Sequence, residues 1–267
     1  MSQPDRSRQW KRQAATVFES DIAYYDTDRE NFPWYRTQLN FTMNSLAGRS
    51  GRVLDLGCAA GVEIAALRAA GFTVVGADFA HPMLLASHYR FANDTHVSLA
   101  QADAEFLPFP DGSFDHVVCL GVLEYLQSYD PCLSEIHRVL RPAGIAVFSL
   151  PSRVSLYNIS ERAGRIFLGP LWHAARRLLG RASAVKVPPH HRNLCIPWRF
   201  LSQLSKRGFQ PLDRANTAFL FAPLARFWPA GQDHLATRLE RFGRSRWLGW
   251  MGSQFVVAAQ KRPARLL

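Results

Sequence analysis

The chain has 267 residues, 48% of them hydrophobic, so it is long enough for one well-buried α/β domain and too short for two large ones. Residues 1–149 carry 12 basic and 17 acidic side chains, whereas residues 150–267 carry 20 and 4. This asymmetry predicts that the second half is attracted to something anionic, such as a membrane surface, a nucleic acid or a charged substrate. The N-terminus MSQPDRSRQWKRQ is basic with no apolar core after it, and no apolar run reaches spanning length, so we expect a cytoplasmic protein.

The elements alternate regularly between residues 52 and 151. Strands are predicted at RVLDLG, FTVVGAD, VSLAQAD, FDHVVCLG and IAVFSLP, and helices at GVEIAALRAAG, at HPMLLASHYRFAN and after Asp130, where Leu133, Ile136 and Leu140 form an inward stripe. Pro142-Ala143-Gly144 is expected to turn the chain into the fifth strand. This rhythm indicates βαβ units and a parallel sheet covered on both faces.

Outside this region the pattern is less regular. Residues 1–50 are expected to be helical and then loop-like, with aromatic side chains that pack over the core. Residues 152–196 are predicted to be a basic amphipathic insertion or lid. Residues 197–267 should add a helix at PWRFLSQLSKRG and strands at FQPLDRA and QFVVAAQK. We therefore expect a single domain with a cap at 1–50, a cofactor-binding core at 51–151, the insertion at 152–196 and completion of the sheet at 197–267.

The four cysteines, Cys58, Cys119, Cys132 and Cys195, show no CxxC pairing and no histidine at metal-ligand spacing. We interpret them as reduced, mostly buried small apolar residues. No metal site is predicted.

The glycine turn VLDLGCAAG, between a strand and a helix, is the main candidate for ligand binding. A phosphate loop would need Gly-Lys-Ser/Thr where Gly61 is followed by Val62 and Glu63, and a dinucleotide fingerprint would need a glycine at Ala59. The remaining pattern is that of nucleoside-sulfonium sites, which Asp55 to Gly61 fits with one substitution. A nicotinamide dehydrogenase is disfavoured because Ala59 stands where the dinucleotide fingerprint needs a glycine.

Two carboxylates at the ends of successive strands support a nucleoside site. Asp78 ends the second strand, 21 residues after Gly57, where an acid can accept hydrogen bonds from ribose hydroxyls. Asp103 ends the third strand and can accept from an adenine amino group. Together they favour a nucleoside over two unrelated solvated carboxylates.

The segments VLDLGCAAG, ADFAHPMLLAS, QADAEFLPFPDGSFDHVVCLGVLEYL and EIHRVLRPAGIAVFSLP, in this order, resemble the class I S-adenosylmethionine-dependent methyltransferases, in particular the quinone-biosynthesis and natural-product enzymes. The resemblance is close over residues 50–151 and looser over 190–262. It implies a Rossmann-like, doubly wound α/β sheet of seven strands, mostly parallel with the last strand antiparallel, with a helical N-terminal segment and substrate-side insertions. It also implies S-adenosyl-L-methionine as cofactor.

Carried over by position, the resemblance implies a set of cofactor-binding residues. Asp55 and the loop Gly57, Cys58, Ala59 and Gly61 would hold the methionine end, and Asp78 the ribose. Phe79 would flank the adenine, Asp103 and Ala104 would meet its amino edge, and the Leu120-Gly121 backbone would lie near the sulfonium. Two departures from the family pattern are Ala59, in place of the middle glycine, and Ala143, in place of the second glycine before the fifth strand.

Methyl transfer is an in-line displacement that depends on positioning and on exclusion of water, and a hydroxyl acceptor benefits from a general base. The candidate bases are His190 and His191, in the turn PPHHRN, followed by Glu124, with His173 and Tyr125 also considered. The alternative for the histidine pair is a surface or loop-packing role. Because the [Asp/Asn/Ser]-Pro-Pro-[Tyr/Phe] signature is absent at Leu120 to Leu123, nucleobase nitrogen is disfavoured as acceptor and nucleic acid is not expected as a partner.

The segment LGPLWHAARRLLGR predicts a basic amphipathic helix, with Arg176, Arg177 and Arg181 on one face. It is either a lid packed on the domain or a peripheral contact with an anionic membrane. We predict an S-adenosylmethionine-dependent methyltransferase that acts on oxygen of a small-molecule or lipid-linked acceptor. The alternatives are a non-catalytic nucleoside-binding scaffold at an anionic membrane surface and an RNA-directed methyltransferase.

Overall fold

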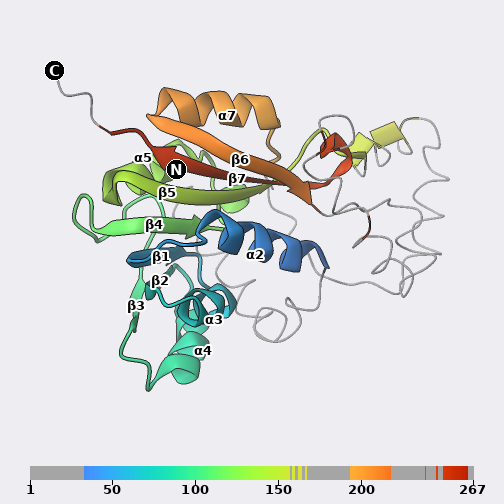
Figure 1. The fold of residues 1–267 in the computed structure, drawn as a ribbon. Coiled ribbons are helices and arrows are strands. Elements are labelled where there is room, and N and C mark those ends of the chain that lie inside the picture. Colours follow the sequence, from blue (N-terminus) through green and yellow to red (C-terminus); the bar gives the residue numbers. More distant parts are fainter. Residues whose placement is uncertain are drawn as a thin grey trace, which may run out of the picture.

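The computed structural model describes residues 33–156, 193–217 and 249–263, together with residues 158, 159, 162, 163, 166, 238 and 245. Seven strands in these residues form one sheet in the order β3-β2-β1-β4-β5-β7-β6 (Figure 1). The parallel strands are β1 (Arg52–Leu56), β2 (Thr73–Asp78), β3 (Val97–Gln101), β4 (Phe114–Cys119) and β5 (Leu140–Pro151). β7 (Gln254–Lys261) runs antiparallel between β5 and β6 (Phe209–Thr217). The expected doubly wound, mostly parallel sheet with an antiparallel last strand is confirmed.

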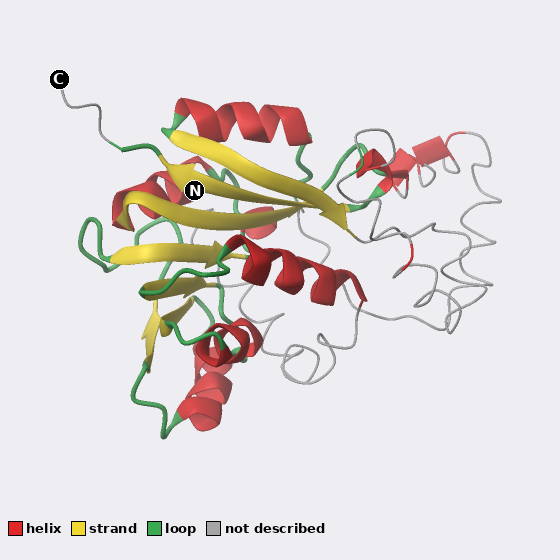
Figure 2. Cartoon of the chain, viewed as in Figure 1, coloured by secondary structure: helices red, strands yellow, loops and turns green. Residues whose placement is uncertain are grey.

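Helices cover both faces of the sheet (Figure 2). One face carries α2 (Pro33–Ser45), α3 (Val62–Ala69) and α4 (His81–Phe91), and the other carries α5 (Asp130–Val139) and α7 (Pro197–Lys206). Neighbouring residues of β1 enter different buried clusters, because successive side chains of a strand point to opposite faces. Val53 joins the cluster of α2, α3 and α4, and Leu54 joins that of α5 and α7. The sheet is therefore covered on both faces, as predicted.

The helix α2 lies within residues 1–50, for which the sequence predicts a helical segment followed by a loop without fixing where the helix begins or ends. Its residues include several weak helix formers, among them Asn40 and Thr42, so local preference gives little signal. Packing supplies the stability instead: Tyr35 and Phe41 of α2, and Leu46 directly after it, are at most 3% exposed. Tertiary burial thus overrides propensity in this segment.

The chain enters β5 differently from the simple turn expected at Pro142-Ala143-Gly144. β5 already begins at Leu140, which pairs with Phe114 before the register shifts by an irregularity. Ala143 has a φ of 64°, in the left-handed region. The local change of direction is present, but it is built into the strand as a bulge-like irregularity and not as a separate turn.

The conspicuous segment LPFPDGSFD is held in place by Arg138 of α5. Its guanidinium donates hydrogen bonds to the carbonyls of Leu107 and Phe109, and pairs at 2.8 Å with the carboxylates of Asp111 and Glu135. The Leu107 N–H donates to the same Glu135 carboxylate at 2.8 Å. Arg138 and Glu135 therefore attach this segment, which lies between β3 and β4 and enters β4, to α5.

The residues at the end of β5 pair with the residues that lead into α7. The Cys195 N–H donates to the Pro151 carbonyl, and the Arg153 N–H donates to the Cys195 carbonyl, each at 2.8 Å. Ser152 and Cys195 thus lie side by side as a parallel bridge.

Within the described parts of the chain, no helix combines the length and the apolar character needed to cross a membrane.

Candidate nucleoside site at the carboxyl ends of the strands

The residues predicted for cofactor binding come from four adjacent strand ends. In the sheet, β1 lies between β2 and β4, and β3 lies next to β2. The register pairs Leu56 with Ala77 and Asp78 with Gln101, so these strands end at about the same level. Ligands of open α/β sheets bind at this edge, where the strand order reverses between β1 and β4.

The glycine loop, residues 57–61, is anchored to the end of β2 by its own backbone. The N–H groups of Gly57 and Cys58 both donate to the Ala77 carbonyl, at 2.7 and 3.2 Å, and Gly61 donates to the Cys58 carbonyl at 2.8 Å. These N–H groups are therefore already hydrogen-bonded within the protein. The glycines instead permit close approach and positive φ, of 80° at Gly57 and 86° at Gly61.

Gly57 lies against the segment that follows β4. A Cβ atom added to Gly57 would come within 2.2 Å of Cγ2 of Val122, which is closer than any real contact. The two loops therefore pack against each other only because position 57 has no side chain. Val122 was not among the predicted site residues, since an apolar residue after a strand gives no distinctive signal.

Ala59 adopts a left-handed conformation, with a φ of 43°. In the described part of the chain, Ala59 and Ala143 are the two non-glycine residues with a positive φ. Both are positions where the sequence departs from the resembled family by replacing glycine with alanine. The backbone has kept the glycine-like conformation, although it is unfavourable for a residue that has a Cβ atom.

Asp78 joins the glycine loop to α4. One oxygen of its carboxylate accepts from the Ala59 N–H at 2.9 Å, and the other accepts from the Ala80 N–H at 2.8 Å. A carboxylate offers about four acceptor positions, so these two donors do not by themselves exhaust it. The side chain is only partly buried. It is suited both to fix the loop and to accept hydrogen bonds from a diol.

The adenine-side candidates lie after β2 and β3. Phe79 is 39% exposed, and its carbonyl accepts from the side chain of Gln101 at 3.0 Å. Asp103 is partly buried and accepts from the Glu105 N–H at 3.0 Å, while Ala104 is 8% exposed. An exposed aromatic residue after one strand and a carboxylate after the neighbouring strand are suited to the flat face and the amino edge of a purine.

The side chains of Asp55 and Cys58 are directed into the protein. Asp55 is 2% exposed and Cys58 is fully buried. Burial raises the pKa of the Cys58 thiol well above its usual value, and the charges of Asp55 and Asp78 act in the same direction. A ligand would therefore meet the backbone at position 58, and the thiol stays protonated.

All four cysteines are buried and free, as predicted. Burial raises the pKa of Cys195 to about 12, which makes a thiolate nucleophile there unfavourable. Among the residues that the structure describes, no group of three or more His, Cys, Asp or Glu side chains is placed to hold a metal ion.

The segment after β4 carries the expected sulfonium-side backbone and one candidate base. Leu120 is 3% exposed, and the Gly121 N–H donates to the hydroxyl of Ser149 on β5 at 3.0 Å. Glu124 lies in the short helix η3 (Leu123–Tyr125) and is 6% exposed. Ser149 was missed, although a polar residue inside the apolar run IAVFSLP is a usable signal.

The remaining catalytic candidates, His190 and His191, and also His173, lie outside the described residues. Asn193 is described, and it contacts the segment after β4. Its N–H donates to the Glu124 carbonyl at 2.9 Å, and its side chain donates to the Leu126 carbonyl. The end of the insertion is thus attached beside Glu124.

The arrangement fits a nucleoside cofactor on three features: the partly buried carboxylate at Asp78, the exposed Phe79 after β2 with Asp103 after the neighbouring β3, and a glycine position that tolerates no Cβ atom. These features come from strands that are neighbours in the sheet. None of them requires a metal ion.

Comparison with known proteins finds similarity to methyltransferases over the strands described above. Residues 54–148 match the family model described as a methyltransferase domain. A demethylmenaquinone methyltransferase from Clavibacter sepedonicus is 35% identical over 147 residues, which are 52% of this chain and 59% of that protein. The chain thus spans little more than half the length of this curated relative.

Solved structures share the fold. The N-methyltransferase NodS from Bradyrhizobium japonicum, in complex with S-adenosyl-L-homocysteine, aligns with a TM-score of 0.60 at 15% identity, covering 92% of this chain and 97% of that one. The [4+2]-cyclase SpnF aligns with a TM-score of 0.55 at 20% identity, covering 86% and 82%. Since one of these is named for a different reaction, the fold alone does not set the chemistry.

The family match begins within β1 and ends within β5, so it includes the strand ends that carry the candidate residues. The resemblance predicted from the sequence motifs is confirmed over this region. Over residues 54–148 the chain is therefore similar to methyltransferase domains, in agreement with the resemblance to class I S-adenosylmethionine-dependent methyltransferases.

Proposed function

We propose that the protein transfers a methyl group from S-adenosyl-L-methionine to an oxygen atom of a small-molecule or lipid-linked acceptor. The observation that carries the proposal is the meeting of the glycine loop, Asp78 and Asp103 at adjacent strand ends inside the methyltransferase-matched region. The name of the curated relative supports a quinone-type acceptor, and the presence of S-adenosylhomocysteine in a structural neighbour supports the cofactor.

In this proposal Asp78 binds the ribose hydroxyls, Phe79 flanks the adenine, and Asp103 and Ala104 meet its amino edge. The glycine loop and the Leu120-Gly121 backbone lie along the methionine end. When bound, the cofactor supplies a methyl group on a cationic sulfur. The charge on sulfur disappears during transfer, so a site that excludes water and aligns the acceptor gives most of the acceleration.

Glu124 is the candidate base within the described residues. It is buried beside the backbone that would face the sulfonium, and its own carbonyl anchors Asn193 at 2.9 Å. A carboxylate there would take the proton of an acceptor hydroxyl as the oxygen attacks. His190 and His191 remain candidates for the same role, supported by their position two to three residues before Asn193.

The test is turnover with methyl-labelled S-adenosyl-L-methionine against a panel of phenols, prenylated hydroquinones and a short RNA. We expect labelled product from a phenol or hydroquinone, with the methyl group located on oxygen by NMR. Label on ring carbon would move the proposal to C-methylation, and label on RNA would favour the RNA-directed alternative. Saturable cofactor binding with no turnover on any acceptor would favour a scaffold.

Two variants separate binding from catalysis. Glu124→Gln keeps the size of the side chain and removes its basicity, so we expect kcat to fall while the affinity for S-adenosylhomocysteine is retained. His190→Ala with His191→Ala tests the competing base. Turnover that is unchanged in the histidine variant and lost in Glu124→Gln would assign the role to Glu124.

A further inference from the structure

Ser87 of α4 contacts the glycine loop across 28 residues of sequence. Its side chain is fully buried, and its hydroxyl donates to the Ala59 carbonyl at 2.7 Å. The N–H of Ala59 donates to the Asp78 carboxylate at 2.9 Å. Ala59 is therefore held by a side chain at each of its two peptide groups.

This double attachment coincides with an unfavourable backbone conformation. For an L-residue with a Cβ atom, the left-handed region is disfavoured by roughly 1–2 kcal/mol, so Ala59 would otherwise populate other conformations. A change of conformation at residue 59 would turn its carbonyl away from Ser87. The hydrogen bond from Ser87 therefore favours the left-handed state selectively.

Ser87 also fits closely under the next glycine. A Cβ atom added to Gly61 would lie 2.9 Å from the Ser87 hydroxyl oxygen and 2.5 Å from Cε2 of Phe91. The hydroxyl is thus enclosed between the Ala59 carbonyl and Gly61. An enclosed hydroxyl that lost its acceptor would be left unsatisfied, which makes this hydrogen bond more important than an exposed one.

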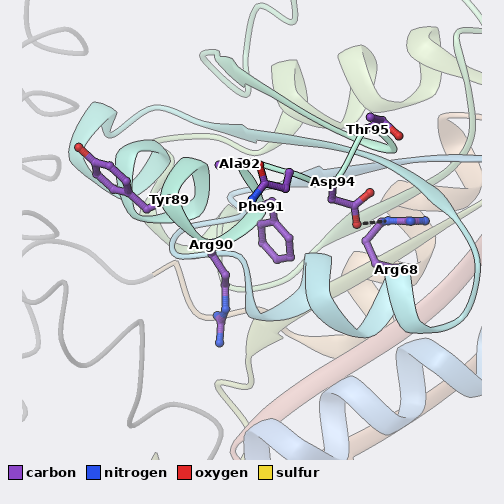
Figure 3. Close-up of a pocket in the computed structure, with 8 residues that line it drawn as sticks. Arg68, Tyr89, Arg90, Phe91, Ala92, Asp94 and Thr95 are labelled. Carbon is purple, nitrogen blue, oxygen red and sulfur yellow. Dashed lines mark hydrogen bonds and ion pairs between the residues drawn. The ribbon is translucent and has the colours of Figure 1, made fainter.

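Arg90, one turn further along α4, makes a weaker contact of the same kind. Its guanidinium donates to the Ala60 carbonyl at 3.3 Å. Arg90 and Phe91 extend from the end of α4, where they line an open depression of about 480 Å³ together with the ion pair of Arg68 and Asp94 (Figure 3). Since Arg90 is exposed, water competes for its hydrogen bond and Ser87 is the stronger attachment.

We infer that Ser87 is a positioning residue for cofactor binding, which acts by holding Ala59 in the left-handed conformation that the loop requires. The inference rests on the proposed function, because it assigns Ser87 to the same cofactor site. Ser87 is the last residue of the segment ADFAHPMLLAS, but neither the sequence motifs nor the comparisons assign it a role in binding.

The experiment is a double-mutant cycle between Ser87→Ala and Ala59→Gly, read by calorimetric titration with S-adenosylhomocysteine. With alanine at position 59, Ser87→Ala should weaken binding about fivefold, the size expected for one net hydrogen bond. With glycine at 59 the left-handed state has no steric penalty, so the same change should weaken binding less than about twofold. Ser205→Ala, which removes a comparable helix hydroxyl on α7, is the matched control.

A second readout does not involve the cofactor. Hydrogen exchange at the Ala59 amide should be faster in Ser87→Ala than in the wild type, and this increase should be smaller with glycine at 59. Equal losses of affinity in both backgrounds, or no loss in either, would overturn the inference. If the folded wild type bound no S-adenosylhomocysteine, the proposed function would fail, and the exchange measurement would still decide whether Ser87 holds the loop.

Discussion

The carboxylate of Asp78 accepts a hydrogen bond from the N–H of Ala59 at 2.9 Å, which ties the acid at the end of β2 to the loop that follows β1. The side chain expected to bind the ribose thus also fixes the loop expected to hold the methionine end. A substitution at Asp78 should therefore also affect the glycine loop, and a substitution at Ala59 should also affect the position of the Asp78 carboxylate.

Replacing either left-handed alanine with glycine should stabilise the protein. Ala59→Gly and Ala143→Gly remove a steric penalty of roughly 1–2 kcal/mol, and about half of that is offset because glycine gains freedom in the unfolded chain. We expect each variant to raise the free energy of unfolding by about 0.5–1 kcal/mol in urea titrations. Ala146→Gly, in the buried part of β5, is the control and should be destabilising. A loss of stability in both test variants would contradict the strain seen at these positions.

Gly57→Ala should disrupt the packing between the loops after β1 and β4. The new Cβ atom would lie 2.2 Å from Cγ2 of Val122, and φ at position 57 is 80°. We expect a loss of about 2–4 kcal/mol in unfolding free energy, which Val122→Ala restores only in part because the backbone strain remains. A purely additive double variant would show that the two loops do not contact each other.

Arg138→Ala should destabilise the fold by about 2–3 kcal/mol, since the guanidinium serves two carbonyls and two carboxylates. Arg138→Lys should recover little, because an ammonium cannot reproduce the planar set of donors. Urea unfolding measures both. Full recovery by lysine would mean that charge alone, and not the hydrogen-bond geometry, holds the LPFPDGSFD segment.

The stability of the protein should fall in mild acid. Burial lowers the pKa of His116 from 6.5, with the charge of Arg49 acting in the same direction, and burial followed by the Lys261 charge lowers that of His137. The unfolded chain therefore binds protons near pH 6.5 that the native state binds only at lower pH, so the free energy of unfolding decreases as the pH falls below about 6.5.

Removing these histidines should flatten that dependence. His116→Phe keeps an aromatic ring against Phe72, and His137→Phe keeps one against Phe209. Unfolding titrations between about pH 5 and pH 7 should show a smaller slope for each variant and the smallest for the pair. An unchanged slope in the double variant would assign the acid sensitivity to other groups.

The sequence predicted the parts of this structure that repeat a pattern. Alternation of apolar strands and helices located β1 to β5, and the spacing from Gly57 to Asp78 and Asp103 located acids on successive strands. Contacts between distant segments could not be predicted in this way. No local signal places Ser87 against Ala59 or Val122 against Gly57, and the weak helix formers of α2 leave the bounds of the predicted N-terminal helix undefined.

The most direct test of the account is calorimetric titration of the full chain with S-adenosylhomocysteine, with NAD as the control ligand. We predict saturable binding of S-adenosylhomocysteine, none of NAD, and a loss of about 100-fold or more in Asp78→Ala, which removes charge-assisted hydrogen bonds to both the ribose and the loop. Binding that is absent in the folded wild type, or unchanged in Asp78→Ala, would contradict the assignment of this strand edge as the cofactor site.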